Sequence, residues 1–149
     1  MIKKITFFII FFVLAEKSHS QEITMEQTVT YINSKLGGSN TIDVVHGEIV
    51  ATFLENGQPY REDQVAIQDL DSNEVKFISN QGLFVINCKA TLKKCVTRNL
   101  FMLRETKTYG RISFPVNLNA ASANGLKNAF LHMIRLVMIR KYESSTPFD

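Results

Sequence analysis

The chain has 149 residues, of which 45% are hydrophobic and 21% charged, and its formal net charge is +3. This length allows one domain to bury enough of its surface to fold without a dense disulfide framework, so we expect a single domain. The sequence contains no internal repeats, low-complexity tracts or linkers that would suggest otherwise.

The charge is distributed unevenly along the chain. Residues 21–75 contain two Lys or Arg against ten Asp or Glu, whereas residues 76–149 contain twelve against three. The basic half indicates either a surface for an anionic partner or strands that simply face the acidic half. No aromatic residues alternate with the cations as stacking platforms would require, so nucleic acid is not an expected partner.

The N-terminus has the pattern of a secretory signal peptide. Lys3 and Lys4 precede the apolar run 5–15, which as a helix would reach only about 16 Å and could not cross about 30 Å of hydrocarbon. Small Ser18 and Ser20 then suit cleavage after residue 20. We therefore expect a signal peptide at 1–20, a periplasmic or secreted location, and no transmembrane anchor after cleavage. No Cys lies near the cut, which excludes a lipoprotein anchor.

Local patterns predict an α+β fold. Thr24 and Gln27 form a capping box before an apolar helical stripe that stops at Gly37-Gly38. An antiparallel meander of six or seven strands follows, because β-branched and aromatic residues then alternate between turn signals. The strands predicted are 41–46, 48–54, 64–70, 75–79, 83–90, 95–102 and 111–116.

A second, amphipathic helix is predicted from about residue 119 or 122 to about Lys141. Leu131, Met138 and Ile139 fall off its core stripe on a helical wheel and form a candidate apolar contact surface. The alternative is that the strands or the first helix cover them. The domain is expected to span 21–142, with a flexible tail at 143–149.

The two cysteines, Cys88 and Cys95, are expected to form a disulfide in an oxidising compartment. The stretch 85–97 reads as a hairpin, and a turn at Thr91-Leu92 would place the cysteines opposite each other about 4.5 Å apart. A redox-active pair is the alternative, although the spacing differs from the two residues of a C-x-x-C motif.

No catalytic, metal-binding or cofactor-binding constellation is found. His46 and His132, the histidines outside the predicted signal peptide, have no Cys or carboxylate at ligand spacing. The acidic run 69–74 resembles the opening of a calcium loop, but Glu74 stands where glycine is required. We therefore expect no enzyme and no cofactor.

Basic residues concentrate between positions 89 and 111. About half of them could share one face of alternating strands and bind an anionic partner, although an edge strand defended by lysines would look the same. The candidate anionic-partner surface consists of Lys89, Lys93, Lys94, Arg98, Arg104, Lys107 and Arg111.

The order of these elements, ending in the helix that contains residues 129–134, resembles small exported bacterial proteins that are uncharacterised. Residues 41–141 also resemble pleckstrin-homology-like barrels, in which a C-terminal helix plugs a bent sheet. The phosphoinositide-binding role of that superfold is not implied, because its basic loop signature and helix tryptophan are missing.

The sequence thus predicts an exported, non-catalytic interaction domain with an unknown partner, a protein or an amphiphile. The alternative is a carrier or sensor that binds an amphiphile inside the sheet, beneath the last helix, or at a membrane surface through that helix.

Overall fold

The computed structural model describes residues 22–145, so the predicted signal peptide and residues 146–149 lie outside the described range. Along the chain, one helix precedes the eight strands and one follows them. The order is α1 (Met25–Leu36), β1 (Asn40–Val45), β2 (Glu48–Glu55), β3 (Gln58–Ala66), β4 (Leu70–Ile78), β5 (Leu83–Cys88), β6 (Val96–Leu100), β7 (Glu105–Tyr109), β8 (Arg111–Pro115) and α2 (Ala120–Ser145). The predicted α+β class is confirmed. No helix within residues 22–145 has the length and apolar character needed to cross a membrane.

Local sequence chemistry sets the bounds of α1. The Thr24 hydroxyl accepts a hydrogen bond from the Gln27 amide at 3.2 Å, and the Gln27 side chain accepts one from the Thr24 amide at 2.9 Å. This is the predicted capping box. The helix ends at Gly37, whose φ of 75° is the left-handed conformation that glycine adopts most easily.

The strands form two antiparallel sheets. Sheet A has the strand order β1-β2-β3-β6-β7, and sheet B has the order β4-β5-β8. Two tight hairpins in sheet A turn at His46-Gly47 and Asn56-Gly57, where both central residues have positive φ. Such turns match the twist of the paired strands.

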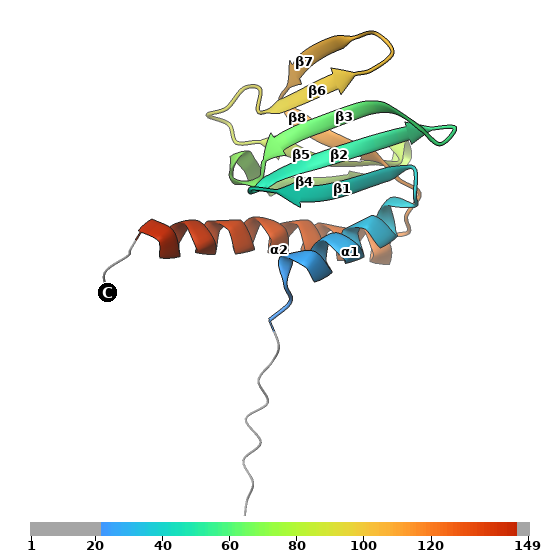
Figure 1. Ribbon diagram of the computed structural model, residues 1–149. Helices are drawn as coiled ribbons and strands as arrows, with labels where there is room; N and C mark the ends of the chain where they lie inside the picture. Colours follow the sequence, from blue (N-terminus) through green and yellow to red (C-terminus); the bar gives the residue numbers. More distant parts are fainter. Residues whose placement is uncertain (1–21, 146–149) are drawn as a thin grey trace, which may run out of the picture.

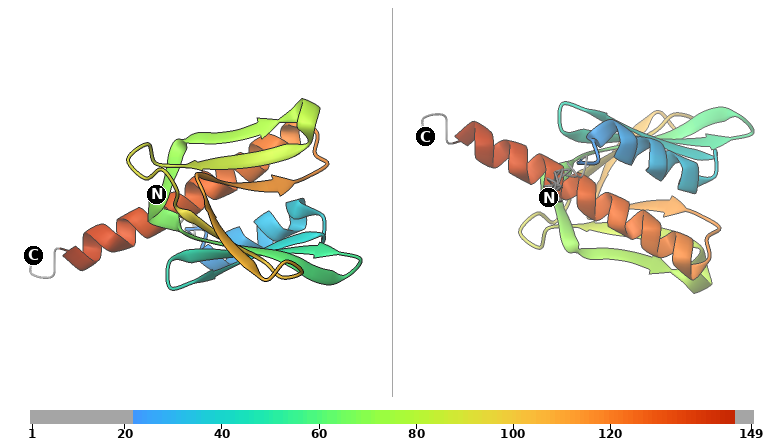
Figure 2. Two further views of the ribbon diagram at one scale, coloured as in Figure 1. Left: turned by 90° about the horizontal axis from the view of Figure 1, so that it is seen from above. Right: turned by 90° about the horizontal axis from the view of Figure 1, so that it is seen from below.

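The sheets face each other, α2 runs along one open side between them, and α1 lies next to it against β1 (Figures 1 and 2). The core between them contains four fully buried phenylalanines from β2, β5, β8 and α2. Phe114 stacks on Phe53 and on Phe130 at 5.7 Å, and Phe130 stacks on Phe84 at 5.4 Å. Aromatic side chains therefore fill the space beneath α2.

Three details of the predicted strands are wrong. The strand expected at 64–70 is the end of β3 followed by a 3-10 turn at Ile67–Asp69, and β7 was not predicted at all. The turn expected at 71–73 lies within β4, where the pairing with β5 shifts between Leu70 and Val75. The error at 71–73 follows from interpreting polar residues as a turn, although an edge strand such as β4 tolerates polar side chains. β7 is also an edge strand with mostly polar residues.

The simple meander is also interrupted, because β3 pairs with β6 and β5 pairs with β8. The hairpin predicted for 85–97 is therefore wrong: β5 is the central strand of sheet B, and β6 belongs to sheet A. Both neighbours of β5 are already other strands, so β6 cannot pair with it. The two sheets do not close into a barrel, so the pleckstrin-homology-like comparison gains no support.

Candidate interaction surfaces

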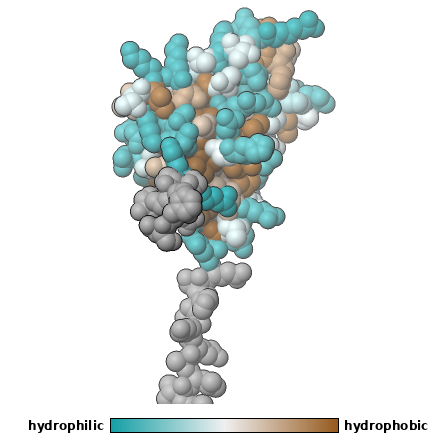
Figure 3. Space-filling view, turned by 60° about the vertical axis from the view of Figure 1, so that its left-hand side comes forward, coloured by the Kyte–Doolittle hydropathy of each residue, from teal (hydrophilic) through white to brown (hydrophobic). Residues whose placement is uncertain are grey.

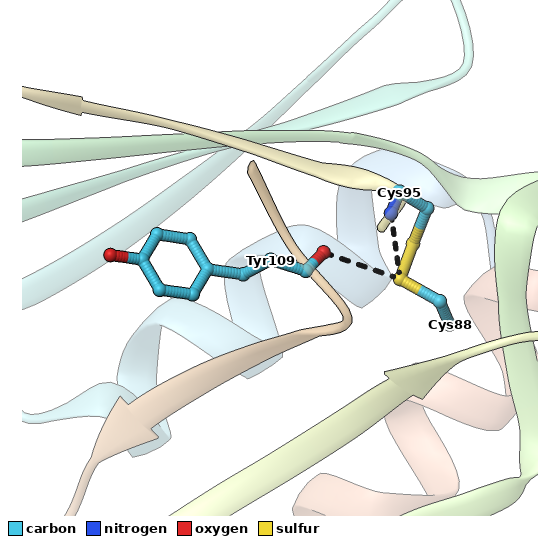
Figure 4. The surroundings of a disulfide bond; sticks show 3 residues. All are labelled: Cys88, Cys95 and Tyr109. Carbon is cyan, nitrogen blue, oxygen red and sulfur yellow. Dashed lines mark hydrogen bonds between the residues drawn. A yellow bond between two sulfur atoms is a disulfide. The ribbon is translucent and has the colours of Figure 1, made fainter. Parts of the chain in front are cut away.

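The disulfide between Cys88 and Cys95 is present, with the Cα atoms 5.8 Å apart. It connects the end of β5 in sheet B to the start of β6 in sheet A. Figure 4 shows the Cys95 amide and the Tyr109 carbonyl beside the sulfur of Cys88, at 3.1 and 3.7 Å. The bridge therefore holds the two sheets together at one end, a role that the predicted hairpin did not include.

The seven cations predicted as one surface separate into three groups. Lys89, Lys93, Lys94 and Arg111 lie at the disulfide end, and Arg104 lies at the turn between β6 and β7. Arg98 is mostly buried in the middle of β6, with Lys107 opposite it on β7. The structure therefore does not gather all seven cations on one face, and four of them lie together at the disulfide end.

Arg98 belongs to a buried cluster with Asp63 and Arg61. Asp63 is fully buried, and the side chains of Arg61 and Arg98 are only 12% and 14% exposed. Arg98 binds both Asp63 oxygens at 2.8 Å, and Arg61 binds the same carboxylate through Nε and Nη2. The carboxylate thus receives two bidentate guanidinium contacts, the strongest geometry for such pairs.

Aromatic rings complete the surroundings of this cluster. The Arg61 guanidinium lies 3.9 Å from the Phe53 ring centre, and that of Arg98 lies 4.1 Å from that of Tyr109. Burial by itself would raise the pKa of Asp63, but the hydrogen bonds and charges of Arg61 and Arg98 outweigh it and hold that pKa below its usual value.

Arg61 also connects the two sheets. Its Nη2 donates to the carbonyl of Ser113 on β8 at 3.3 Å, while its own strand, β3, belongs to sheet A. The cluster therefore joins β3 and β6 of sheet A to β8 of sheet B, and its buried charged groups are hydrogen-bonded. Its role is structural, so Arg98 is removed from the candidate anionic-partner surface.

The β6–β7 hairpin carries the two most exposed large apolar residues of the described chain. Phe101, Met102 and Leu103 form its tip and are 44%, 85% and 65% exposed. The Phe101 amide donates to the Tyr60 carbonyl at 3.1 Å, so the base of the tip is fixed on β3. A run of three or more exposed apolar side chains is unfavourable in a folded domain unless it serves a function.

Arg104 closes this tip in an unusual conformation. Its φ is 53°, in the left-handed region where glycine is favoured, and its amide donates to the Phe101 carbonyl at 3.3 Å. Backbone strain of this kind is concentrated at functional sites. Beside it, Lys107 pairs with Glu105 at 2.7 Å. The sequence signal that could have revealed the tip is the apolar run 100–103 followed by a charged residue.

The apolar surface predicted on the last helix is only partly exposed. Leu131 is half-buried and packs against the core, so its assignment to an exposed contact surface is wrong. Met138 and Ile139 are 45% and 42% exposed. The difference arises because α1 and the strands cover more of α2 near its middle than near its C-terminal end.

A surface groove of about 660 Å³ separates α1 from α2. Tyr31 and Ala129 are among the residues that line it, and Arg135 is the one charged residue in its lining. His132 also lines it and donates from Nε2 to the Ile23 carbonyl at 2.8 Å, which fixes the segment before α1 on α2. Within residues 22–141, no three His, Cys, Asp or Glu side chains gather as a metal site would require.

Comparisons of this chain with protein-family models, with curated proteins and with solved structures found no match. The interpretation below therefore rests on the residues and their geometry.

Proposed function

We propose that this protein is an exported, non-catalytic interaction domain that binds a protein partner through the tip of its β6–β7 hairpin, Phe101 to Arg104. The observation that carries the proposal is the exposure of three consecutive large apolar side chains on a rigid hairpin. Their burial in a partner would stabilise a complex by about 1.5–3 kcal/mol for each side chain that becomes fully covered.

A protein pocket suits the tip better than an anionic membrane does. Membrane-surface elements combine apolar side chains with an excess of cations. Near the tip, Glu105 opposes Lys107, which leaves Arg104 as the net charge of the hairpin end. The exposed cations on the β5–β6 connection and at the start of β8 lie at the disulfide end. The strand β6 separates that end from the hairpin tip (Figure 1).

Two features support export. The predicted signal peptide occupies residues 1–20, and the cysteines of the domain are joined in a disulfide, which persists in oxidising compartments. The proposed location is the periplasm or the outside of the cell.

A carrier of an amphiphile is the second candidate. The interior beneath α2 is an unfavourable site for a carried ligand, because the stacked rings of Phe84, Phe114 and Phe130 fill it. The groove between α1 and α2 favours this candidate instead, since it offers an apolar lining with Arg135 available for an anionic head. Its open position on the surface suits transient binding.

The test is co-purification of the tagged protein from its native producer with a photoreactive residue at position 102. We expect one protein to co-purify in stoichiometric amount and to cross-link at the tip. The variant Met102→Asp/Leu103→Asp should lose it, whereas the matched control Met138→Asp/Ile139→Asp should retain it. Retention by the tip variant would refute the proposed site. Recovery of lipid or a small molecule with both variants would instead establish the carrier.

A further inference from the structure

The end of the molecule that carries the disulfide holds a second feature, a group of four exposed or half-exposed cations. Three of them, Lys89, Lys93 and Lys94, lie on the connection between β5 and β6, and Arg111 begins β8. We refer to these four residues as the basic pad. We propose that the basic pad binds an anionic polysaccharide, a polymer that repeats carboxylate or sulfate groups.

The backbone beneath the basic pad is rigid. The Lys89 amide donates to the Asp69 carbonyl at 2.9 Å, and the Leu92 amide donates to the Lys89 carbonyl at 2.8 Å. The Cys88 amide donates to the Gly110 carbonyl at 2.8 Å, and the disulfide closes the loop at Cys95. These bonds hold the backbone that carries the cations, which lowers the entropy cost of binding.

Gly110 brings the two parts of the basic pad together. A Cβ at this position would lie 2.8 Å from the Lys93 carbonyl oxygen, a distance that real side chains do not adopt. Only glycine lets the β7–β8 turn approach the lysine loop so closely. Arg111, the next residue, is thereby placed beside the lysines although it lies 17 positions after Lys94 in the chain.

The cations of the basic pad are not neutralised by neighbouring acids. Among the side chains described, those of residues 22–141, the salt bridges involve Arg61, Lys76, Arg98 and Lys107, and none involves the basic pad. Glu74 lies in the same row of sheet B as Arg111, but it binds Lys76 and Asn87 at 2.5 and 3.2 Å. Asp69 contacts the lysine loop through its backbone carbonyl, and no salt bridge joins its carboxylate to the described cations of the basic pad.

The surroundings favour a polysaccharide over other polyanions. Nucleic-acid sites need aromatic platforms for the bases, and the one large hydrophobic side chain exposed on this loop is Leu92, at 38%. A membrane site needs a larger apolar anchor next to the cations. Figure 3 shows the molecule with the left-hand side of Figure 1 turned forward, where hydrophilic residues surround hydrophobic ones nearer the middle. The inference uses the export part of the proposed function and is independent of the hairpin tip.

The experiment measures binding of the mature protein to a heparin dodecasaccharide and to an alginate oligomer across about 50 to 200 mM salt. The test variant is Lys89→Gln/Lys93→Gln/Lys94→Gln. The control is Lys127→Gln/Arg140→Gln/Lys141→Gln on α2, which removes the same charge from exposed positions. We expect the test variant to weaken binding about tenfold or more and to flatten the salt dependence by about one unit of slope per cation. The control should change affinity less than twofold.

Circular dichroism confirms that both variants are folded before their affinities are compared. Equal loss in both variants would overturn the proposal, because net charge rather than the basic pad would then explain binding. Absence of binding to either saccharide would overturn it too. Binding only to vesicles of anionic phospholipid would assign the basic pad to a membrane. None of these results depends on the tip, since Met102→Asp/Leu103→Asp should bind the saccharides as the wild type does.

Discussion

The hydroxyl of Tyr31 on α1 occupies the position that a side chain at Gly125 on α2 would fill. Tyr31 Cζ lies 3.4 Å from that same point, so the hydroxyl alone makes the contact too close. Gly125 thus leaves room for the Tyr31 side chain, which lines the groove between α1 and α2.

Gly125→Ala is expected to lower the free energy of unfolding by about 1 kcal/mol, because the added methyl group displaces the Tyr31 ring. This reverses the usual result, since Gly→Ala inside a helix is ordinarily stabilising by about 0.8–1 kcal/mol. Urea unfolding followed by circular dichroism gives the value. In the Tyr31→Phe background the same substitution should become stabilising, because the hydroxyl is gone. An equal effect in both backgrounds would contradict the assigned contact.

Asp63→Asn is expected to destabilise the protein by about 3–5 kcal/mol, since it leaves two guanidiniums without their buried counter-charge. Thermal unfolding measures the loss. The control is the triple variant Arg61→Met/Asp63→Leu/Arg98→Met, which removes every charge of the cluster and should cost much less than the single substitution. If the triple variant is less stable than Asp63→Asn, the cluster stabilises the fold by more than the mutual neutralisation of its buried charges.

The same cluster predicts the acid dependence of stability. The folded-state pKa of Asp63 lies below its unfolded value of about 3.9, so the stabilisation is fully present above that pH. It is lost as the pH falls below about 4 and through the lower folded-state pKa. Unfolding free energies of wild type and Asp63→Asn should therefore converge toward acid pH. A constant difference between pH 7 and the lowest pH at which both fold would exclude this origin.

Removal of the disulfide by Cys88→Ser/Cys95→Ser should lower the free energy of unfolding by about 2–3 kcal/mol, the chain-entropy value for a loop this short. Chemical denaturation of the oxidised wild type and of the variant provides the comparison. Adding reductant to the wild type should reproduce the loss and leave the variant unchanged. Sensitivity of the variant to reductant would show that another effect is involved.

Arg104→Gly should stabilise the protein by about 0.5–1 kcal/mol, because glycine relieves the left-handed backbone at φ 53°. If Arg104 contributes to the proposed partner site, the same variant should bind the partner more weakly. Denaturation and partner capture are measured on the same sample. Increased stability with unchanged capture would limit the proposed site to the three apolar residues before Arg104.

Short-range chemistry was readable in the sequence. The capping box of Thr24 and Gln27 and the turn at Asn56-Gly57 depend on residues one to three positions apart, and both are present. The stripe of α2, including Phe130, repeats with the helical period because one side faces the core. These features made the class and most element positions predictable.

Pairings over long sequence distances were not readable. Asp63 and Arg98 are 35 positions apart, and nothing local distinguishes this arginine from the exposed cations near it. The hairpin tip was missed for a related reason. In the sequence, Leu100 to Leu103 look like the continuation of a buried strand. In the structure, β6 ends at Leu100 and the three residues after it are exposed.

The sequence by itself therefore determined the two terminal helices, the antiparallel strands between them and the pairing of the two cysteines, because a cap, a turn or a lone cysteine pair leaves few alternatives. The tertiary structure alone decided which strands share a sheet, that the disulfide joins the two sheets, and which cations and apolar side chains reach the surface. Those outcomes depend on competition among many strand registers of similar local energy, and only the burial of the shared core distinguishes them.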